Sequence, residues 1–264
     1  MYEHLLFAVS DGICRITLNR PQVHNALNPA LIQEITSAVE AAGADDSVRV
    51  VVLTGAGDKA FCSGADLKEA AGHLQEDSGF SMGALLRSTY HPMVRAIRNL
   101  PKPVICRLNG VAAGAGCSLA LACDVVIATD ESYVSFLFVG IGLMPDAGST
   151  FFLPRLIGAQ KAFELCSTGR KVFGAEAAQL GLVSRSVPAA DLDRAVAETA
   201  GFYASAPTQA IGLMKLAINQ SIHTDLETQL EQEAQYQDLL GKTGDAAEGI
   251  LAFLAKRKPV FRGK

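Results

Sequence analysis

The sequence predicts an α/β fold, because short buried strands alternate with helices along most of its 264 residues. Two runs rich in β-branched residues, Val48–Gly55 and Pro103–Gly110, end in glycine and are apolar throughout, as strands buried on both faces are. Parallel strands joined through helices have right-handed crossovers. The β patterns stop near Pro188, so we expect an α/β core over residues 1–190 and a helical region over residues 191–264.

The elements of the core follow in order. Residues 7–18 alternate around Asp11-Gly12, a pair that tolerates positive φ, and predict a β-hairpin. Asn28-Pro29 supplies an N-cap and a first-turn proline for a helix with one apolar face that ends near Gly43. After the strands named above, residues 124–128 predict a further strand.

The helical region has segments with helical patterns that we place at 192–204, 207–219, 226–240 and 246–256. Earlier in the chain, residues 72–88 are rich in glycine and serine and have mixed polarity. They predict either a mobile loop or a loosely held helix beside a ligand site.

Composition excludes several classes of function. The net charge of −4 provides no basic surface for nucleic acid or anionic lipid, and no stretch approaches the roughly 20 apolar residues of a membrane span. An acidic residue, Glu3, stands where a signal peptide has positive charge, so we expect a cytoplasmic protein. Charged residues make up only 19%, which predicts a homo-oligomer with apolar contacts. Six irregularly spaced cysteines indicate neither a metal site nor a disulfide framework.

Small residues dominate two segments, 61–67 and 109–117, each directly after a strand. Glycine lets bare backbone approach a ligand, and if the second segment leads into a helix, its free N–H groups would stabilise an oxygen that gains negative charge. The alternative is that the small residues only permit close packing of strand and helix. Neither segment has the glycine spacing of a phosphate loop or of a dinucleotide-binding motif.

These segments, together with further short motifs, resemble the crotonase (enoyl-CoA hydratase/isomerase) superfamily over essentially the whole chain. The matching marks are Asn19-Arg20-Pro21, Asn25-Ala26-Leu27, residues 61–68, residues 102–117, Ala122-Cys123-Asp124, Pro145 with Gly148, and the tail at 252–259. The resemblance implies a spiral of ββα units with a C-terminal helical trimerisation region. It also implies that the peptide N–H groups of Ala65 and Ala115 hold the thioester oxygen of an acyl-CoA.

Coenzyme A is then part of the substrate, with no tightly bound cofactor and no metal. The resemblance places its contacts at Ala26, Asp66, Leu67 and Lys68, and at Lys256 of a neighbouring subunit. The assembly it implies is a homotrimer or a dimer of trimers.

The acids over the thioester decide which reaction a family member catalyses. The two glutamates of the hydratases fall on Ser118 and Phe138 here, and water addition without an acid and a base should be poor. Asp146 instead matches the carboxylate of the family's ring-epoxide isomerases and of some enoyl- and dienoyl-CoA isomerases. Apolar neighbours such as Phe136 and Ile141 would desolvate this carboxylate and raise its pKa.

The sequence therefore predicts an acyl-CoA isomerase in which Asp146 shuttles a proton beside an enolate. It would shift a double bond or rearrange a ring 1,2-epoxide of phenylacetyl-CoA. Three alternatives stay open: an enoyl-CoA hydratase, an enzyme like the aryl-CoA dehalogenases, and a non-catalytic acyl-CoA-binding protein. The dehalogenases have a histidine near His91, but they carry tryptophan where this chain has Phe138.

Overall fold

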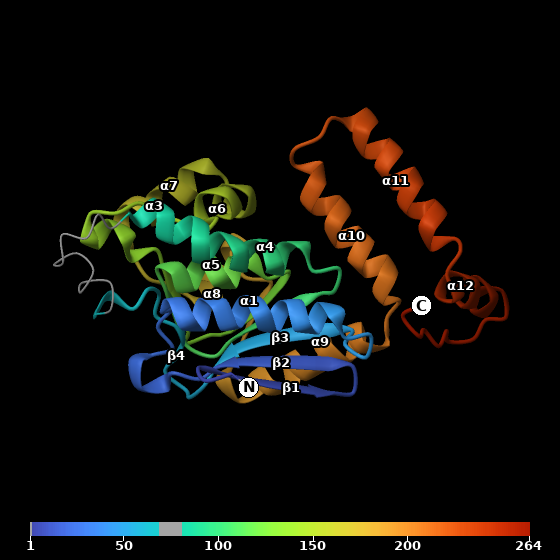
Figure 1. Ribbon diagram of the computed structural model, residues 1–264, viewed down its shortest axis with the longest axis horizontal. Coiled ribbons are helices and arrows are strands. Elements are labelled where there is room, and N and C mark those ends of the chain that lie inside the picture. Colours follow the sequence, from blue (N-terminus) through green and yellow to red (C-terminus); the bar gives the residue numbers. More distant parts are fainter. Residues whose placement is uncertain (1, 69–80) are drawn as a thin grey trace.

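Two β-sheets form the centre of the molecule in the computed structural model, which describes residues 2–68 and 81–264 (Figure 1). The larger, six-stranded sheet has the order β1 (Leu5–Ser10), β2 (Ile13–Leu18), β3 (Val50–Gly55), β5 (Val104–Leu108), β7 (Val125–Thr129) and β10 (Arg185–Val187). The smaller, four-stranded sheet has the order β4 (Ala60–Cys62), β6 (Val111–Ala113), β8 (Tyr133–Ser135) and β9 (Val172–Phe173).

Three successive turns of chain build both sheets. In each turn the first strand (β3, β5 or β7) joins the larger sheet and the second (β4, β6 or β8) joins the smaller one, with parallel pairing between turns. Helices follow each strand pair: α3 (Met82–Leu85) and α4 (His91–Asn99), then α5 (Ala115–Ala122), then α6 (Ser149–Ile157). This arrangement confirms the predicted α/β class and the spiral of ββα units.

The first elements form where the sequence predicts them. Strands β1 and β2 pair as an antiparallel hairpin, and the turn residues Asp11 and Gly12 have φ of 52° and 78°. Helix α1 (Pro29–Ala44) begins after Asn28, whose side chain accepts a hydrogen bond of 2.9 Å from the N–H of Leu31. Short 3₁₀ helices lie at Pro21–Val23, Leu137–Ile141 and Ala189–Asp191.

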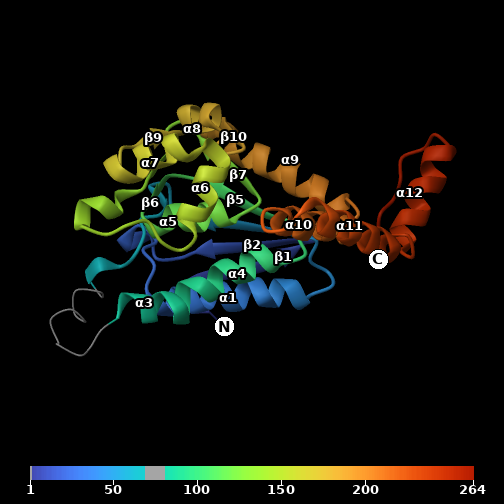
Figure 2. The same cartoon turned by 90° about the horizontal axis from the view of Figure 1, so that it is seen from above.

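Helices cover both faces of the larger sheet, which is why β3 is buried along its whole length. Val51 and Leu53 face the core shared with α1 and α4. The alternate residues Val50 and Val52 face α9 (Leu192–Ser205) on the opposite side (Figure 2). Helix α9 therefore packs on the sheet, and the predicted boundary at residue 190 stays a prediction.

Residues 82–99 form one helical segment with a widened turn in its middle. The turn is a π-helix over Leu86–Tyr90, in which the N–H of His91 bonds the carbonyl of Leu86. Pro92 explains it, because proline cannot donate to the carbonyl four residues earlier and its ring crowds that group. Of the predicted loop or loose helix at 72–88, residues 69–80 lie outside the described part of the chain, and residues 82–88 are helical.

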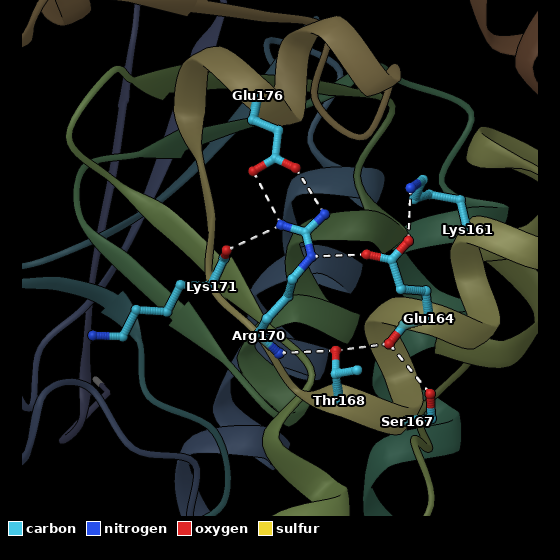
Figure 3. Close-up of polar contacts among 7 residues, drawn as sticks. All are labelled: Lys161, Glu164, Ser167, Thr168, Arg170, Lys171 and Glu176. Atoms are coloured by element: carbon cyan, nitrogen blue, oxygen red, sulfur yellow. Dashed lines mark hydrogen bonds and ion pairs between the residues drawn. The ribbon is translucent and has the colours of Figure 1, made fainter.

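The segment after α6 closes the smaller sheet. Helices α7 (Ala159–Thr168) and α8 (Gly174–Leu180) flank β9, and Arg170 lies between them (Figure 3). Its guanidinium contacts Glu164 at 3.0 Å and Glu176 at 2.7 Å. All three side chains are about one-third or more exposed, so this cluster contributes little to stability.

The last helices extend away from the α/β body: α10 (Thr208–Ser221), α11 (Leu226–Leu240) and α12 (Gly244–Leu254) (Figure 1). A buried ion pair attaches α10 to the core, since Lys215 Nζ lies 2.7 Å from a carboxylate oxygen of Asp124. The same ammonium donates to the carbonyls of Ile97 and Lys102. None of the helices described in the structure is long and apolar enough to cross a membrane.

Candidate active site

A cavity of about 260 Å³ opens where the ββα turns meet the helical segment 82–99. Backbone from the two small-residue segments forms one wall. The other walls are mostly apolar, with side chains from Leu85, Leu86, Leu137, Phe138 and Ile141. The polar side chains among the described residues that line it are Ser63, Tyr90 and Asp146.

Ala65 presents its N–H to this cavity because of how its segment pairs with the chain after Asn25. Leu27 and Ala65 form a parallel bridge, in which the N–H of Leu27 bonds the carbonyl of Gly64 at 2.7 Å and the N–H of Asp66 bonds the carbonyl of Leu27 at 2.9 Å. In this pattern the N–H of Ala65 itself points to the other side. It donates no hydrogen bond to any described residue.

Ala115 is the first residue of α5, as expected if the second small-residue segment leads directly into a helix. Its N–H belongs to the first turn, where donors have no partner within the helix and the positive end of the dipole lies. Gly114 precedes it with φ of 50° and turns the chain from β6 into the helix. Ala115 lines the same cavity wall, and its N–H donates no hydrogen bond to any residue in the described part of the chain.

The two segments also pack tightly against each other. A Cβ atom at Gly64, which has φ of 96°, would lie 2.7 Å from the carbonyl oxygen of Ala113, and one at Gly116 would overlap the carbonyl of Cys62. Close packing of the two segments is therefore observed, and contact of their backbone with a ligand stays a prediction. The glycines let the segments that follow β4 and β6 approach each other, and Ala65 and Ala115 both line the cavity.

Asp146 reaches the cavity from a tight loop before α6. Ala147 and Gly148 follow it with φ of 48° and 90°. Ser118 in α5 anchors this loop, because its hydroxyl donates to the carbonyl of Asp146 at 3.0 Å and lies 2.7 Å from the hydroxyl of Ser149. Ser118 is fully buried beneath the loop.

The carboxyl of Asp146 is poorly solvated. Its Oδ1 is buried and has no hydrogen-bond partner among the described residues. Burial raises the pKa of Asp146 from 3.8 to about 6, which confirms the direction that its apolar neighbours predict. A carboxyl with this pKa is mostly ionised at neutral pH but can still release a proton that it has accepted.

The model of the enoyl-CoA hydratase/isomerase family matches residues 8–264. The chain belongs to this family. It is 41% identical to a protein of Rhodobacter capsulatus named probable enoyl-CoA hydratase, over 100% of this chain and 99% of that one. It is 39% identical to 1,2-epoxyphenylacetyl-CoA isomerase of Escherichia coli, over the full length of both. The crystal structure of an enoyl-CoA hydratase from Bacillus anthracis matches with a TM-score of 0.91 and 37% identity, covering 99% of this chain and 100% of that one.

The two positions where the hydratases have catalytic glutamates carry Ser118 and Phe138 in this chain. Neither residue is an acid, and the two have different roles in the structure. Phe138 lines the cavity as an apolar wall, whereas Ser118 holds the Asp146 loop. His91 begins α4 and is not among the described residues that line the cavity. Burial raises the pKa of Cys62 to about 12, so a thiolate nucleophile at this wall is disfavoured.

The positions that the family resemblance assigns to coenzyme A lie in several surroundings. Arg20 donates to the carbonyl of Ala26 at 2.7 Å and forms an ion pair of 2.9 Å with the carboxylate of Asp66. These two contacts link the segment at Ala26 to the segment that contains Ala65. Leu67 lines the cavity, and Lys68 is exposed.

Lys256, the remaining position assigned to coenzyme A, is exposed just after α12. In both views α12 lies at the opposite end of the molecule from α3, which borders the cavity (Figures 1 and 2). Within one chain, therefore, Lys256 is remote from the site. Its predicted contact requires another subunit.

Tyr90 also lines the cavity and is only 5% exposed, although no motif in the sequence predicts it as a site residue. Proline two positions after a tyrosine, inside a helical pattern, is the signal that could have indicated a locally altered turn here. As for metals, no group of three or more His, Cys, Asp or Glu suited to an ion occurs in residues 2–68 and 81–264, and the prediction that none binds stays a prediction.

Proposed function

We propose that the chain is an acyl-CoA isomerase that moves a proton within its substrate by means of Asp146. The observation that carries this proposal is that one apolar cavity contains a poorly solvated carboxyl and two peptide N–H groups that donate to no described residue. Among the described residues that line the cavity, Asp146 is the one carboxylic acid. A double-bond shift needs one such group, because the proton removed from one carbon returns to another.

In the proposed reaction the thioester oxygen accepts hydrogen bonds from the N–H groups of Ala65 and Ala115. These donors stabilise the negative charge that develops on the oxygen when the ionised Asp146 removes a proton next to the thioester or at its vinylogous position. The enolate then takes the proton back at a different carbon, and the double bond has moved. No atom is gained or lost, and Asp146 returns to its ionised form.

The natural substrate we propose is a 3-enoyl-CoA or a ring 1,2-epoxide of phenylacetyl-CoA. The second choice is supported by the 39% identity to the isomerase from Escherichia coli. With the epoxide, the same donors and Asp146 would assist ring opening and rearrangement to the seven-membered oxepin thioester, which is also an isomerisation. The apolar walls formed by residues such as Phe138 and Leu137 suit an aromatic or alicyclic group.

Hydratase activity is the second candidate, because the relative from Rhodobacter capsulatus carries that name at 41% identity. Against it stand Ser118 and Phe138, because Asp146 is then the one carboxylic acid among the described residues that line the cavity, and water addition needs both an acid and a base. A dehalogenase-like enzyme and a non-catalytic acyl-CoA-binding protein are the remaining candidates. Both would bind the thioester in the experiment below without isomerising it, and release of halide from a halogenated aryl-CoA would distinguish the first from the second.

We also propose that coenzyme A binds only as part of the substrate and that the active assembly is a homotrimer or a dimer of trimers. Large apolar side chains are exposed on the C-terminal helices, including Leu226 (69%), Phe253 (82%) and Leu254 (72%). A patch of this kind is typical of an interface. A neighbouring subunit would also bring Lys256 toward the coenzyme A phosphates. Sedimentation equilibrium tests the assembly, and a monomer at micromolar concentration contradicts it.

The decisive experiment follows conversion of a 3-enoyl-CoA to its 2-enoyl isomer, with the hydration product measured in the same reaction. Wild type is compared with Asp146→Asn and with a control, Asp58→Asn, at an exposed position between β3 and β4. We expect isomerisation by wild type and the control, and its loss in Asp146→Asn with thioester binding retained. Hydration that survives in Asp146→Asn would contradict the role of Asp146, and binding without any turnover by wild type would favour the dehalogenase-like or the non-catalytic alternative.

A further inference from the structure

We propose that Tyr90 selects acyl groups that carry an oxygen atom, by donating a hydrogen bond from its hydroxyl inside the cavity. This inference rests on the proposed function only in taking the cavity as the site of the acyl group. It concerns which acyl groups bind, and the proton transfer is still assigned to Asp146 alone. Tyr90 is therefore a specificity residue in this proposal.

The backbone around Tyr90 departs from a regular helix at the point where it meets the cavity. Tyr90 is the last residue of the π-helical turn, and Leu86, the first residue of that turn, also lines the cavity. A single π-helical turn inserts an extra residue into the helix, so the side chains after it are rotated relative to those before it. Such turns often occur at functional sites. The side chain of Thr89 stabilises the widened turn, since its hydroxyl donates to the carbonyl of Leu85 at 2.6 Å.

The Tyr90 hydroxyl has no acceptor or donor partner among the residues that the structure describes. The residue is only 5% exposed, and its hydroxyl makes no hydrogen bond to any residue in the described part of the chain. Ser63, the other hydroxyl on the wall, already donates to the carbonyl of Val23 at 3.4 Å. Tyr90 therefore supplies the hydroxyl donor that a ligand in this cavity can use.

Asp146 lies close enough to Tyr90 to affect its protonation. Burial, and after it the negative charge of Asp146, raise the pKa of Tyr90 well above its usual value of 10. The phenol thus stays protonated at neutral pH and can act as a hydrogen-bond donor. The Tyr90 hydroxyl does not donate to Oδ1 of Asp146, because that oxygen has no hydrogen-bond partner among the described residues.

Whether the buried hydroxyl of Tyr90 finds a hydrogen-bond partner depends on the acyl group of the bound substrate. A purely hydrocarbon acyl group would displace water and leave the phenol without a partner, which is unfavourable in an apolar cavity. An acyl group with an ether, epoxide, hydroxyl or carbonyl oxygen in reach restores the bond. Sites that hydrogen-bond a substrate oxygen discriminate strongly against the analogue that lacks it. We expect a preference of about ten- to a hundredfold in affinity.

The test measures binding of phenylacetyl-CoA and of its 2-, 3- and 4-hydroxyphenyl analogues by titration calorimetry. These thioesters have no double bond outside the aromatic ring to shift, so the result is independent of isomerase activity. We expect wild type to bind at least one hydroxylated analogue about ten- to a hundredfold more tightly than phenylacetyl-CoA. Tyr90→Phe should bind all of them equally, and Tyr203→Phe, a tyrosine outside this cavity, should behave as wild type.

Two results would overturn the inference. In the first, wild type binds all four thioesters with equal affinity, which means that no donor acts on the ring substituent. In the second, Tyr90→Phe keeps the preference, which assigns it to Asp146 accepting from the ligand's hydroxyl. If the isomerase assay fails while the preference and its loss in Tyr90→Phe are observed, the specificity role stands and only the proposed reaction falls.

Discussion

Replacing Asp146 with asparagine should make the protein more stable at alkaline pH while abolishing its chemistry. The carboxyl is held in apolar surroundings that raise its pKa from 3.8 to about 6. A shift of about two pH units corresponds to about 3 kcal/mol between the ionised and neutral forms. The folded chain bears this cost whenever Asp146 is ionised, and an asparagine side chain has no charge to desolvate.

The pH dependence has a definite sign. Below pH 3.8 the carboxyl is protonated in the folded and the unfolded chain, and its burial as an acid adds no ionisation cost. As pH rises from 3.8 to about 6, the unfolded chain ionises first, so the folded state loses stability, and the loss is complete above about pH 6. The gain from Asp146→Asn should therefore be largest at pH 8 and should shrink toward pH 4.5.

Urea denaturation at pH 8 and at pH 5 measures this difference. Part of the gain is offset because the new amide must itself be satisfied, so we expect Asp146→Asn to raise the free energy of unfolding by about 1–3 kcal/mol at pH 8. In a thermal melt this corresponds to an increase in Tm of several degrees. The exposed control Asp58→Asn should change neither value. An equal gain at both pH values, or no gain at pH 8, would refute the reasoning.

Three further outcomes are expected. The kcat/KM of wild type should rise with pH through about 6, because only ionised Asp146 accepts a proton; a flat profile from pH 5 to 8 would contradict this. Gly64→Ala should lower kcat by about a hundredfold or more, since its Cβ would lie 2.7 Å from a backbone oxygen of the neighbouring segment, whereas Gly201→Ala, with nothing within 4 Å, should keep full activity. Lys215→Ala should reduce the free energy of unfolding by about 2–3 kcal/mol in urea denaturation, because it removes the ammonium 2.7 Å from Asp124 and leaves the carbonyls of Ile97 and Lys102 without their donor, while Arg98 at 3.5 Å still pairs with Asp124; a change below about 1 kcal/mol would contradict this.

Local signals in the sequence were sufficient for much of the fold. Asn28 caps α1 and Asp11-Gly12 form the hairpin turn as predicted, because each depends on a few consecutive residues. The buried strands were evident from their β-branched runs. The placement of α9 on the larger sheet was not evident, since its contacts with residues such as Val50 join parts of the chain that are far apart in sequence.

Part of the candidate site could likewise be predicted from the sequence, and part could not. Ala65 and Ala115 were assigned by the resemblance to the family through the motifs in which they stand, and the structure places both on the wall of the cavity. Tyr90 and Ser118 could not be predicted, because their contributions depend on which loop each one faces. Tyr90 meets the cavity through an irregular turn, and Ser118 reaches the carbonyl of Asp146, 28 residues away.

The position of the two peptide donors in the spiral bears on how such a protein can change its reaction. Ala65 follows β4 and Ala115 follows β6, and these strands are neighbours in the smaller sheet. The distance between the Ala65 and Ala115 N–H groups therefore follows from the spacing of the adjacent strands β4 and β6. It requires no particular side chain apart from the absence of one at Gly64 and Gly116. The acid comes from the next turn, after β8. In the proposed reaction the acid can therefore change while the strands that position the two donors stay the same, and a designer could vary the acid separately from those donors.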